Sequence, residues 1–190
     1  MEPFARIVIG YHGCTEAFAH ELLLGAKPLD QWQPSTNDWD WLGHGVYFWE
    51  HSPERAMRWA REKFTAQGDK PTVVGAVIQL GRCFDLLNEA MTEILAQSYQ
   101  ELSAPYEAAG KVLPQNRGRD WKIRELDCMV INDCMRRLAS HGVVYDTVRG
   151  AFLEGAPAYP NAGFSREAHI QIAIRNPACV LGVFRPNWKL

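Results

Sequence analysis

The sequence lacks the features that several common classes of protein require. No stretch approaches the roughly 20 consecutive apolar residues that cross a bilayer, so no membrane span is expected. The five cysteines form no C-x-x-C pair, which argues against a disulfide framework and predicts a reducing compartment. A formal net charge of -2 is far from the basic excess of a protein that holds nucleic acid by a broad charged surface.

Several site motifs are missing as well. There is no G-x-x-x-x-G-K-[ST] phosphate loop, no H-E-x-x-H helix and no paired spacing of zinc ligands, so no metal is expected. Gly43 and Gly45 do not form a G-x-G-x-x-G dinucleotide fingerprint, because Phe48 takes the third glycine position and a strand follows. Cys14 lies beside His12, but without an orienting third group we interpret it as a small, partly buried thiol.

The start of the chain has no apolar run or cleavage site of a signal peptide, so we expect a cytoplasmic protein, with export by a dedicated system left open. What is present is an ordinary globular composition, with 47% hydrophobic and 22% charged residues in 190 positions. One domain spanning residues 1–190 is therefore predicted.

The order of secondary-structure elements predicts an α+β sandwich. Runs rich in β-branched and aromatic residues predict strands at 4–11, 45–50, 72–80, 82–87, 142–146, 169–174 and 178–184. Capping and periodicity predict helices at 15–25, 52–64 and within 88–140, the last interrupted by a loop at 110–120. Residues 26–44 and 147–167 are predicted to be long loops, and 169–174 with 178–184 a closing pair of strands.

Three motifs lie in a suggestive order: Y-H-G-C-T at 11–15, G-H-G-V-Y-F at 43–48 and H-I-Q-I-A-I at 169–174. With them the chain resembles an ADP-ribosyltransferase of the diphtheria-toxin and poly(ADP-ribose) polymerase branch. The resemblance covers most of the chain. It implies two packed, mainly antiparallel sheets, with flanking and inserted helices, around a cleft that binds NAD.

The resemblance also implies how NAD would be held. Gly13 would supply backbone contacts to the nicotinamide carboxamide, Tyr47 and Trp59 would stack on the ring, and His12 would bind the adenosine ribose. A flat ring with a polar edge suits such a site. The alternative is that Tyr47 and Trp59 only pack the core.

Further binding candidates surround these residues. The turn at Gly43 and Gly45 would let the backbone approach the cofactor, because neither residue has a Cβ. Thr15 completes the first motif. The loop at 26–44 lies where relatives bind the adenosine half of NAD, so Ser35, Asn37 and Asp38 are candidates for polar contacts, with turn-forming residues as the alternative.

The chain departs from the family at the catalytic position, where Gln171 replaces a glutamate. A neutral amide can hold ribose hydroxyls but cannot act as a base. Glu154, in the loop before this strand, is one candidate to compensate. Glu167 lies on the same face of the strand, but about 13 Å from Gln171 at strand rise. Ala56 replaces a hydroxyl residue three positions before the stacking Trp59.

We therefore expect a mono-ADP-ribosyltransferase that cleaves the nicotinamide–ribose bond of NAD and transfers ADP-ribose to a macromolecular acceptor. Gln171, Glu154 and Tyr47 are the catalytic candidates, NAD is the substrate and the protein is expected to be a monomer. A protein acceptor is favoured over nucleic acid. The small size resembles toxins, effectors and phage-defence enzymes. The alternatives are an NAD glycohydrolase, a non-catalytic module that binds NAD or ADP-ribose, and a structural domain.

Overall fold

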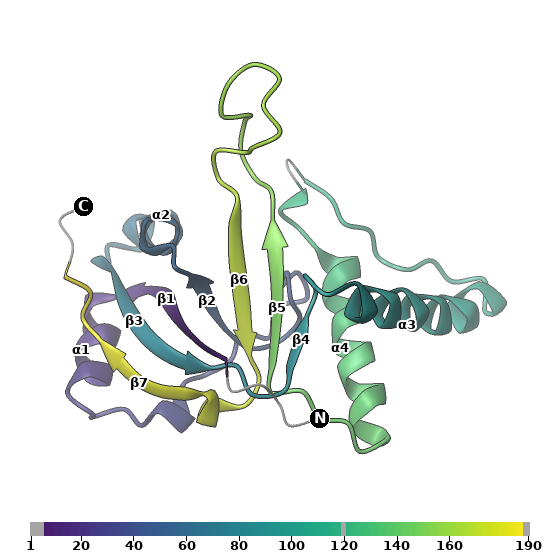
Figure 1. The fold of residues 1–190 in the computed structure, drawn as a ribbon, viewed down its shortest axis with the longest axis horizontal. Coiled ribbons are helices and arrows are strands. Elements are labelled where there is room, and N and C mark those ends of the chain that lie inside the picture. The colour runs from purple at the N-terminus through teal and green to yellow at the C-terminus, as the bar shows by residue number, and fades with distance from the viewer. Residues whose placement is uncertain (1–5, 119–120, 188–190) are drawn as a thin grey trace.

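Seven strands form one mixed sheet in the computed structural model, which describes residues 6–118 and 121–187 (Figure 1). The strands are β1 (Ile7–Thr15), β2 (Val46–Glu50), β3 (Pro71–Gln79), β4 (Cys83–Asp85), β5 (Thr147–Phe152), β6 (His169–Ile174) and β7 (Val180–Phe184). They lie in the order β4-β5-β6-β2-β1-β3-β7, and in these residues only β4 and β5 pair in parallel. The α+β class predicted from the sequence is confirmed.

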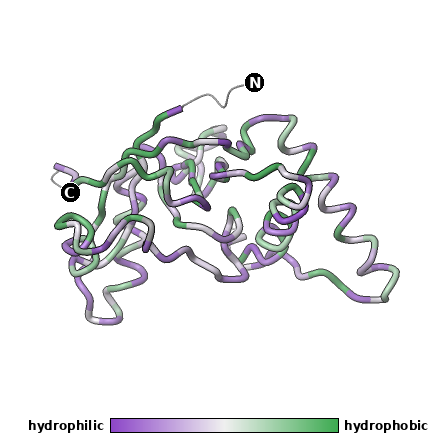
Figure 2. The backbone as a smooth tube through the Cα atoms, turned by 90° about the horizontal axis from the view of Figure 1, so that it is seen from below, coloured by the Kyte–Doolittle hydropathy of each residue, from purple (hydrophilic) through white to green (hydrophobic). Residues whose placement is uncertain are grey.

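Four α-helices accompany the sheet in the described part of the chain. They are α1 (Glu16–Leu23), α2 (Pro53–Phe64), α3 (Glu89–Ala108) and α4 (Glu125–Ser140), with short 3-10 helices η1 (Leu29–Gln31), η2 (Thr65–Gln67) and η4 (Pro177–Cys179). None of the described helices has the length and apolar character of a membrane span. Figure 2 shows hydrophilic residues interrupting the hydrophobic ones throughout the fold.

The two faces of the sheet pack against different helices. Because side chains alternate along a strand, Phe48 points to one face while Tyr47 and Trp49 point to the other. On the first face, α1 buries Leu22 in the same cluster as Phe48. On the second face, α2 covers Trp49, and α4 packs Ile131 against the side formed by β5 and β6.

The sheet divides between β1 and β2. Among the described residues these strands pair only at Gly10–Glu50 and Tyr11–Trp49, whereas β1 pairs with β3 at nine positions and β2 with β6 at five. Beyond Tyr11 and Trp49 the two strands separate, and we call this separation the fork. The expectation of two packed sheets is wrong in this respect, because the two halves remain joined by hydrogen bonds at the base of the fork.

The strand predicted at 142–146 is also wrong. Gly142 has φ 79° and forms a turn after α4. Asp146 is held by its side chain, which accepts a hydrogen bond from Arg82 N at 2.8 Å. Pairing starts at the next residue, so the strand is β5, in a segment that the sequence predicted to be loop.

The predicted closing pair does not form. β6 lies inside the sheet between β2 and β5, while β7 pairs with β3 at the far edge. The strand predicted at 4–11 runs from Ile7 to Thr15, so His12 and Gly13 lie within it and not at its exit. Residues 4 and 5 of that prediction lie outside the described part of the chain. The helices predicted at 15–25, 52–64 and within 88–140 are confirmed.

A long loop connects β5 to β6 and stands away from the sheet in Figure 1. We call residues 153–168 the finger. It is folded on itself, since Ala158 N donates to Phe164 O at 2.8 Å and Arg166 N to Ala156 O at 3.0 Å. At its base Glu167 N donates to Glu154 O at 3.1 Å, which continues the β5–β6 register beyond the ends of the two strands.

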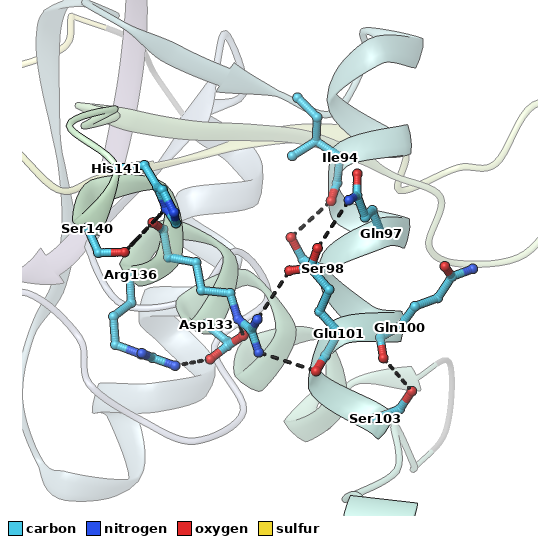
Figure 3. Close-up of polar contacts among 11 residues, drawn as sticks. Ile94, Gln97, Ser98, Gln100, Glu101, Ser103, Asp133, Arg136, Ser140 and His141 are labelled. Atoms are coloured by element: carbon cyan, nitrogen blue, oxygen red, sulfur yellow. Dashed lines mark hydrogen bonds and ion pairs between the residues drawn. The ribbon is translucent and has the colours of Figure 1, made fainter. Parts of the chain in front are cut away.

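Charged side chains dock α3 on α4. Arg137 of α4 pairs with Asp133 at 2.5 Å and with Glu101 of α3 at 3.1 Å. Asp133 also pairs with Arg136, as Figure 3 shows. Ser98 of α3 bonds back to its own helix at Ile94 O. This ion-pair cluster supports the helices and is separate from the fork.

Candidate functional site

A cleft of about 1030 Å³ opens at the fork. Its walls come from β1 on one side, from β2 and the preceding loop on the other, and from α2 and the base of the finger. All the predicted cofactor-binding residues line it: His12, Gly13, Thr15, Asn37, Gly45, Tyr47 and Trp59. Two of the three predicted catalytic residues, Gln171 and Glu154, line it as well, and Tyr47 is the third. The fold thus brings together residues from five separate segments.

The peptide groups of Gly13 face the fork. In antiparallel strands the peptide groups of successive residues point alternately to the two neighbouring strands. Even positions of β1 point to β3, as shown where Glu16 N donates to Lys70 O at 2.9 Å. Odd positions point to β2, as shown where Ile9 O accepts from His51 N at 3.0 Å. Gly13 has odd parity, so its N–H and C=O point to where β2 has separated.

Gly13 is also where α2 meets the sheet. A Cβ at Gly13 would lie 2.4 Å from Ala56 O and 3.1 Å from Trp59 Cε3. Any larger residue would push the helix away and move the Trp59 ring from the edge of the fork. Ala56 is fully buried in this contact, so its small side chain serves the packing of α2 on the sheet.

The aromatic walls are held by their neighbours. The Tyr47 hydroxyl donates to Gly43 O at 2.6 Å and accepts from Leu42 N at 2.8 Å, which fixes the ring against the turn before β2. Burial and the charge of Asp40 raise the pKa of Tyr47 well above its ordinary value, so the phenol stays neutral. The Trp59 ring lies 5.7 Å from Trp49, centroid to centroid.

His12 bridges the two arms of the fork. Its Nδ1 lies 2.8 Å from Tyr47 O, and because a carbonyl only accepts, Nδ1 carries the proton and Nε2 is left as an acceptor. Burial lowers the pKa of His12 to about 4, so the ring is neutral at physiological pH. The ring packs edge-on against Trp32 at 4.8 Å.

The smaller polar candidates have structural partners. Thr15 Oγ1 accepts from Phe18 N at 3.2 Å and caps α1. Asn37 and Ser35 both bond to Asp40, at 3.1 Å from Asn37 N and 2.9 Å from Ser35 Oγ, so they form a turn network. Asp38 is exposed and does not line the cleft. Asp40, which the sequence did not single out, organises this loop.

The two glycines of the second motif have internal reasons to be glycine. Gly43 has φ 72°, a conformation that favours glycine, and a Cβ there would lie 2.7 Å from Asn132 Oδ1. A Cβ at Gly45 would lie 2.9 Å from Ile174 O. The missing Cβ atoms make room for α4 and β6.

Gln171 is oriented by a histidine. His169 Nδ1 lies 2.8 Å from Glu167 O and therefore carries the proton, which leaves Nε2 as an acceptor. Gln171 Nε2 lies 2.9 Å from that nitrogen and donates to it. Burial lowers the pKa of His169, which favours this neutral state. The amide oxygen of Gln171 and its second amide hydrogen make no other hydrogen bond that the structure records among the described residues.

Three carboxylate residues line the cleft, Asp40, Glu62 and Glu154, and of these only Glu154 is buried. Its side chain is only 2% exposed, and Oε2 pairs with Arg55 Nη2 of α2 at 2.5 Å. His169 Nδ1 lies 3.7 Å from the same oxygen. Glu167 instead pairs with Arg58 at the partly exposed base of the finger, at 2.8 Å, and does not line the cleft. Glu154, which the sequence offered as a candidate to compensate for Gln171, thus lies in the wall of the cleft.

Arg55 was missed in the sequence. It occupies the third position of a helix whose first turn reads P-E-R, where an arginine is ordinarily solvated. Its burial against Trp49 depends on where the finger lies, which no local pattern indicates. Cys14 is buried, and burial raises the pKa of its thiol to about 12, so it is not a nucleophile at neutral pH.

Within the described residues no group of three or more His, Cys, Asp or Glu side chains is arranged to hold a metal ion. Comparisons of the chain with protein-family models, curated proteins and solved structures find no match. The geometry of the cleft is therefore the basis on which a function can be inferred.

Proposed function

We propose that the protein is a mono-ADP-ribosyltransferase with an ADP-ribosyltransferase-like fold, which uses NAD as its substrate and a macromolecule as its acceptor. One observation carries the proposal: the N–H and C=O of Gly13 face the open fork beside Trp59, with Tyr47 on the opposite arm. A planar primary amide on an aromatic ring matches this set, because it offers one acceptor, one donor and a flat face.

The chemistry requires little covalent help from the protein. The bond between the nicotinamide nitrogen and the ribose breaks, and nicotinamide leaves with the bonding electrons, which neutralises its ring charge. The ribose develops positive charge, and the acceptor's nucleophilic atom bonds to it while the acceptor's proton passes to water. Catalysis then comes from positioning the two reactants and from negative charge near the sugar.

The residues of this chain divide these tasks. Gly13, Tyr47 and Trp59 would hold the nicotinamide, and His12 Nε2 would accept from a hydroxyl of the adenosine ribose. Glu154 supplies the negative charge that Gln171 lacks. Gln171 offers its amide oxygen and one hydrogen of its amide nitrogen, because the other hydrogen is donated to His169. Protein is favoured as the acceptor over nucleic acid, given a net charge of -2.

Labelled NAD tests the proposal. Purified protein is incubated with NAD labelled in the adenylate part and with a cell lysate, and label is followed in protein and nucleic acid while free nicotinamide is quantified. Transfer of label to protein, abolished in a Glu154→Gln variant, supports the proposal. Nicotinamide release without transfer would identify an NAD glycohydrolase. Calorimetric binding of NAD without release would identify a binding module, and the absence of both would reject NAD as the ligand.

A further inference from the structure

A second cavity lies away from the fork, at the end of the sheet where β6 ends and β5 begins. It measures about 430 Å³ and is lined by the second half of α4, by the turn before β5 and by the turn after β6. None of its lining residues also lines the cleft at the fork. Small-molecule sites have volumes of roughly 300–1,000 Å³, so the chemistry of the lining decides what this cavity can bind.

Arg175 of this lining is a partly buried cation without a counter-charge. Its Nη1 donates to His44 O at 3.0 Å and to Asn132 Oδ1 at 3.4 Å, and both acceptors are neutral. Among the described residues no carboxylate pairs with Arg175, whereas the buried Arg55 and Arg149 each pair with a glutamate. Burial lowers the pKa of Arg175. A charge removed from water is ordinarily paired, so this arginine points to an anion that comes from outside the chain.

Two nitrogens of Arg175 remain for such an anion. Nε and Nη2 make no hydrogen bond within the described part of the chain. The nitrogens that lack a partner and are also sealed from solvent belong to Trp49, Arg55 and Arg124. Arg175 is not one of these residues, so its two free donors are open to solution.

Arg136 of α4 brings a second guanidinium to the same cavity. Asn132, which accepts from Arg175, precedes Arg136 by one helical turn, so the guanidinium of Arg175 lies beside the position of Arg136. Figure 3 shows Arg136 on the side of α4 that is turned away from α3. Its Nη2 pairs with Asp133, and the side chain is 72% exposed. Nε and Nη1 of Arg136 are therefore free to bind a ligand.

The charged lining carries one excess positive charge. Arg136 and Arg175 are cations, and Asp146 is the carboxylate of this lining. Both oxygens of Asp146 already accept hydrogen bonds, from Arg82 N at 2.8 Å and from Asn176 Nδ2 at 2.8 Å. A monoanion balances this lining. A phosphate monoester carries close to two negative charges at neutral pH, so Asp146 would oppose it more strongly.

The remaining lining favours an organic ligand. Met135, Ala139, Val144 and Pro177 present apolar surface to the cavity, and Val144 is 60% exposed. An apolar body would cover this surface, while a carboxylate matches the edge of a guanidinium through two parallel hydrogen bonds.

We propose that Arg136 and Arg175 form a binding site for an organic acid, in which one carboxylate is carried on a small apolar body. The carboxylate accepts from the free nitrogens of the two arginines, and the apolar body lies against Met135 and Val144. Either a free acid or the C-terminal residue of a peptide presents this chemistry. The site is separate from the cleft at the fork and does not depend on the proposed NAD chemistry.

Calorimetry with matched probes tests the site. The probes are hexanoate, its neutral amide hexanamide, inorganic phosphate and N-acetylleucine, which presents the C-terminal carboxylate of a peptide. We expect hexanoate to bind at least about tenfold more tightly than hexanamide, because the amide loses the charge-assisted hydrogen bonds. Phosphate should bind more weakly than hexanoate, because it has no apolar body. The tighter binder of the two acids identifies the source of the carboxylate.

Three variants locate the bound acid. Arg136→Gln should weaken hexanoate binding by at least about fivefold, and Arg175→Gln should abolish the preference over hexanamide. Arg137→Gln is the matched control, because it removes the same charge from the next position of α4. Arg137 pairs with Glu101 of α3 and does not line the cavity, so hexanoate affinity should stay within about twofold. Circular dichroism verifies that each variant is folded.

The outcomes are distinct from those of the NAD experiments. The site is wrong if the wild type binds hexanoate no better than hexanamide, or if folded Arg136→Gln and Arg137→Gln give the same hexanoate affinity. Tighter binding of phosphate than of hexanoate would overturn the assignment of an organic acid. Failure of the protein to bind NAD would reject the proposed function and leave this site standing.

Discussion

Two buried arginine–glutamate pairs lie on opposite faces of the same sheet, and they are built differently. Arg149 bonds to both oxygens of Glu50, at 2.6 and 2.9 Å, and to Asp85 at 3.2 Å. Arg55 makes one bond to Glu154, at 2.5 Å, and each partner keeps an unused polar atom. The side chains of Arg149 and Glu50 are 10% and 9% exposed, and those of Arg55 and Glu154 are 10% and 2% exposed, so burial does not explain the difference.

The comparison distinguishes an ion pair that supports the sheet from an ion pair that lines the cleft. The Arg149 network joins β2, β4 and β5 and satisfies its own groups, as a structural pair must when it is removed from water. The same chain can therefore build a complete pair from the same residue types.

The largest expected effect is on the structural pair. Glu50→Gln leaves Arg149 without its bidentate partner, and breaking a buried pair costs about 3–5 kcal/mol. Urea denaturation should show a loss of this size in the free energy of unfolding. The same change in Glu154 should cost clearly less, because only one hydrogen bond is weakened. Equal losses in Glu50→Gln and Glu154→Gln would remove the distinction between the two pairs.

As pH falls, the histidines of the cleft side of the sheet should lower the stability of the protein before the carboxylates of the Arg149 network do. Because the folded pKa of His12 is lowered to about 4, the unfolded chain binds this proton more readily, and stability falls as pH drops from about 6.5 to about 4. The loss from His12 alone is about 3 kcal/mol at the acid end. His169, whose pKa burial also lowers, adds to it.

The Arg149 network should keep its contribution to stability over the same pH range. Burial raises the pKa of Asp85, but hydrogen bonds from Arg6 and Leu87 and the charge of Arg149 outweigh it, so the net pKa is lowered. The stability that Asp85 contributes is present above its ordinary pKa and is lost only below that value. A His12→Gln variant should therefore flatten the decline between pH 6.5 and 4. An unchanged pH profile in this variant would contradict the assignment.

The proposed stacking of Trp59 on the ligand predicts a smaller effect. This effect is on the affinity for NAD and not on the stability of the fold. Trp59→Ala removes an aromatic face worth about 1–2 kcal/mol, so NAD should bind about 5- to 30-fold more weakly by calorimetry. Phe64, whose ring centre lies 5.8 Å from that of Trp59, is the last residue of α2 and also lines the cleft, so it offers a comparison of two aromatic side chains in the same wall. Phe64→Leu should change NAD affinity less than Trp59→Ala. The reverse order would show that the nicotinamide ring does not stack on Trp59.

The smallest predicted effect is the loss of stability caused by replacing Gln171 with glutamate. In Gln171→Glu the carboxylate would face the acceptor nitrogen of His169, so the contact needs a protonated ring and the pKa of His169 should rise. The variant should be less stable than the wild type by about 1 kcal/mol at pH 8 and should recover as pH falls through the raised pKa. NMR titration of His169 measures the shift. A pKa as low as in the wild type would show that the Gln171–His169 orientation is wrong.

Local patterns were enough for most elements and for the membership of the cleft. The helix at Ser52–Pro53 and the strand at Val46–Glu50 follow from capping and β-branched content, and the motifs placed Gly13 and Tyr47 in one cleft. Strand neighbours were not predictable in this way. β6 and β7 are adjacent in sequence, yet they pair with different halves of the sheet because the fork separates those halves.

The incomplete ion pair was also beyond the sequence. Glu154 was a candidate, but Arg55 and Trp49 were not. Their proximity to Glu154 depends on how the base of the finger is held, with Glu167 N donating to Glu154 O, and the sequence does not indicate this. An arginine in a first helical turn and a tryptophan in a strand have ordinary structural explanations in sequence. Unsatisfied hydrogen bonding is a property of three-dimensional packing, so no spacing rule could have indicated it.

The most direct measurement is a crystal structure of the protein with NAD bound. The account predicts the carboxamide on the peptide groups of Gly13 and the nicotinamide ring beside Trp59, with Tyr47 on the opposite arm of the fork. A complex in which NAD lies outside the fork, or in which the peptide groups of Gly13 meet only water, would contradict it.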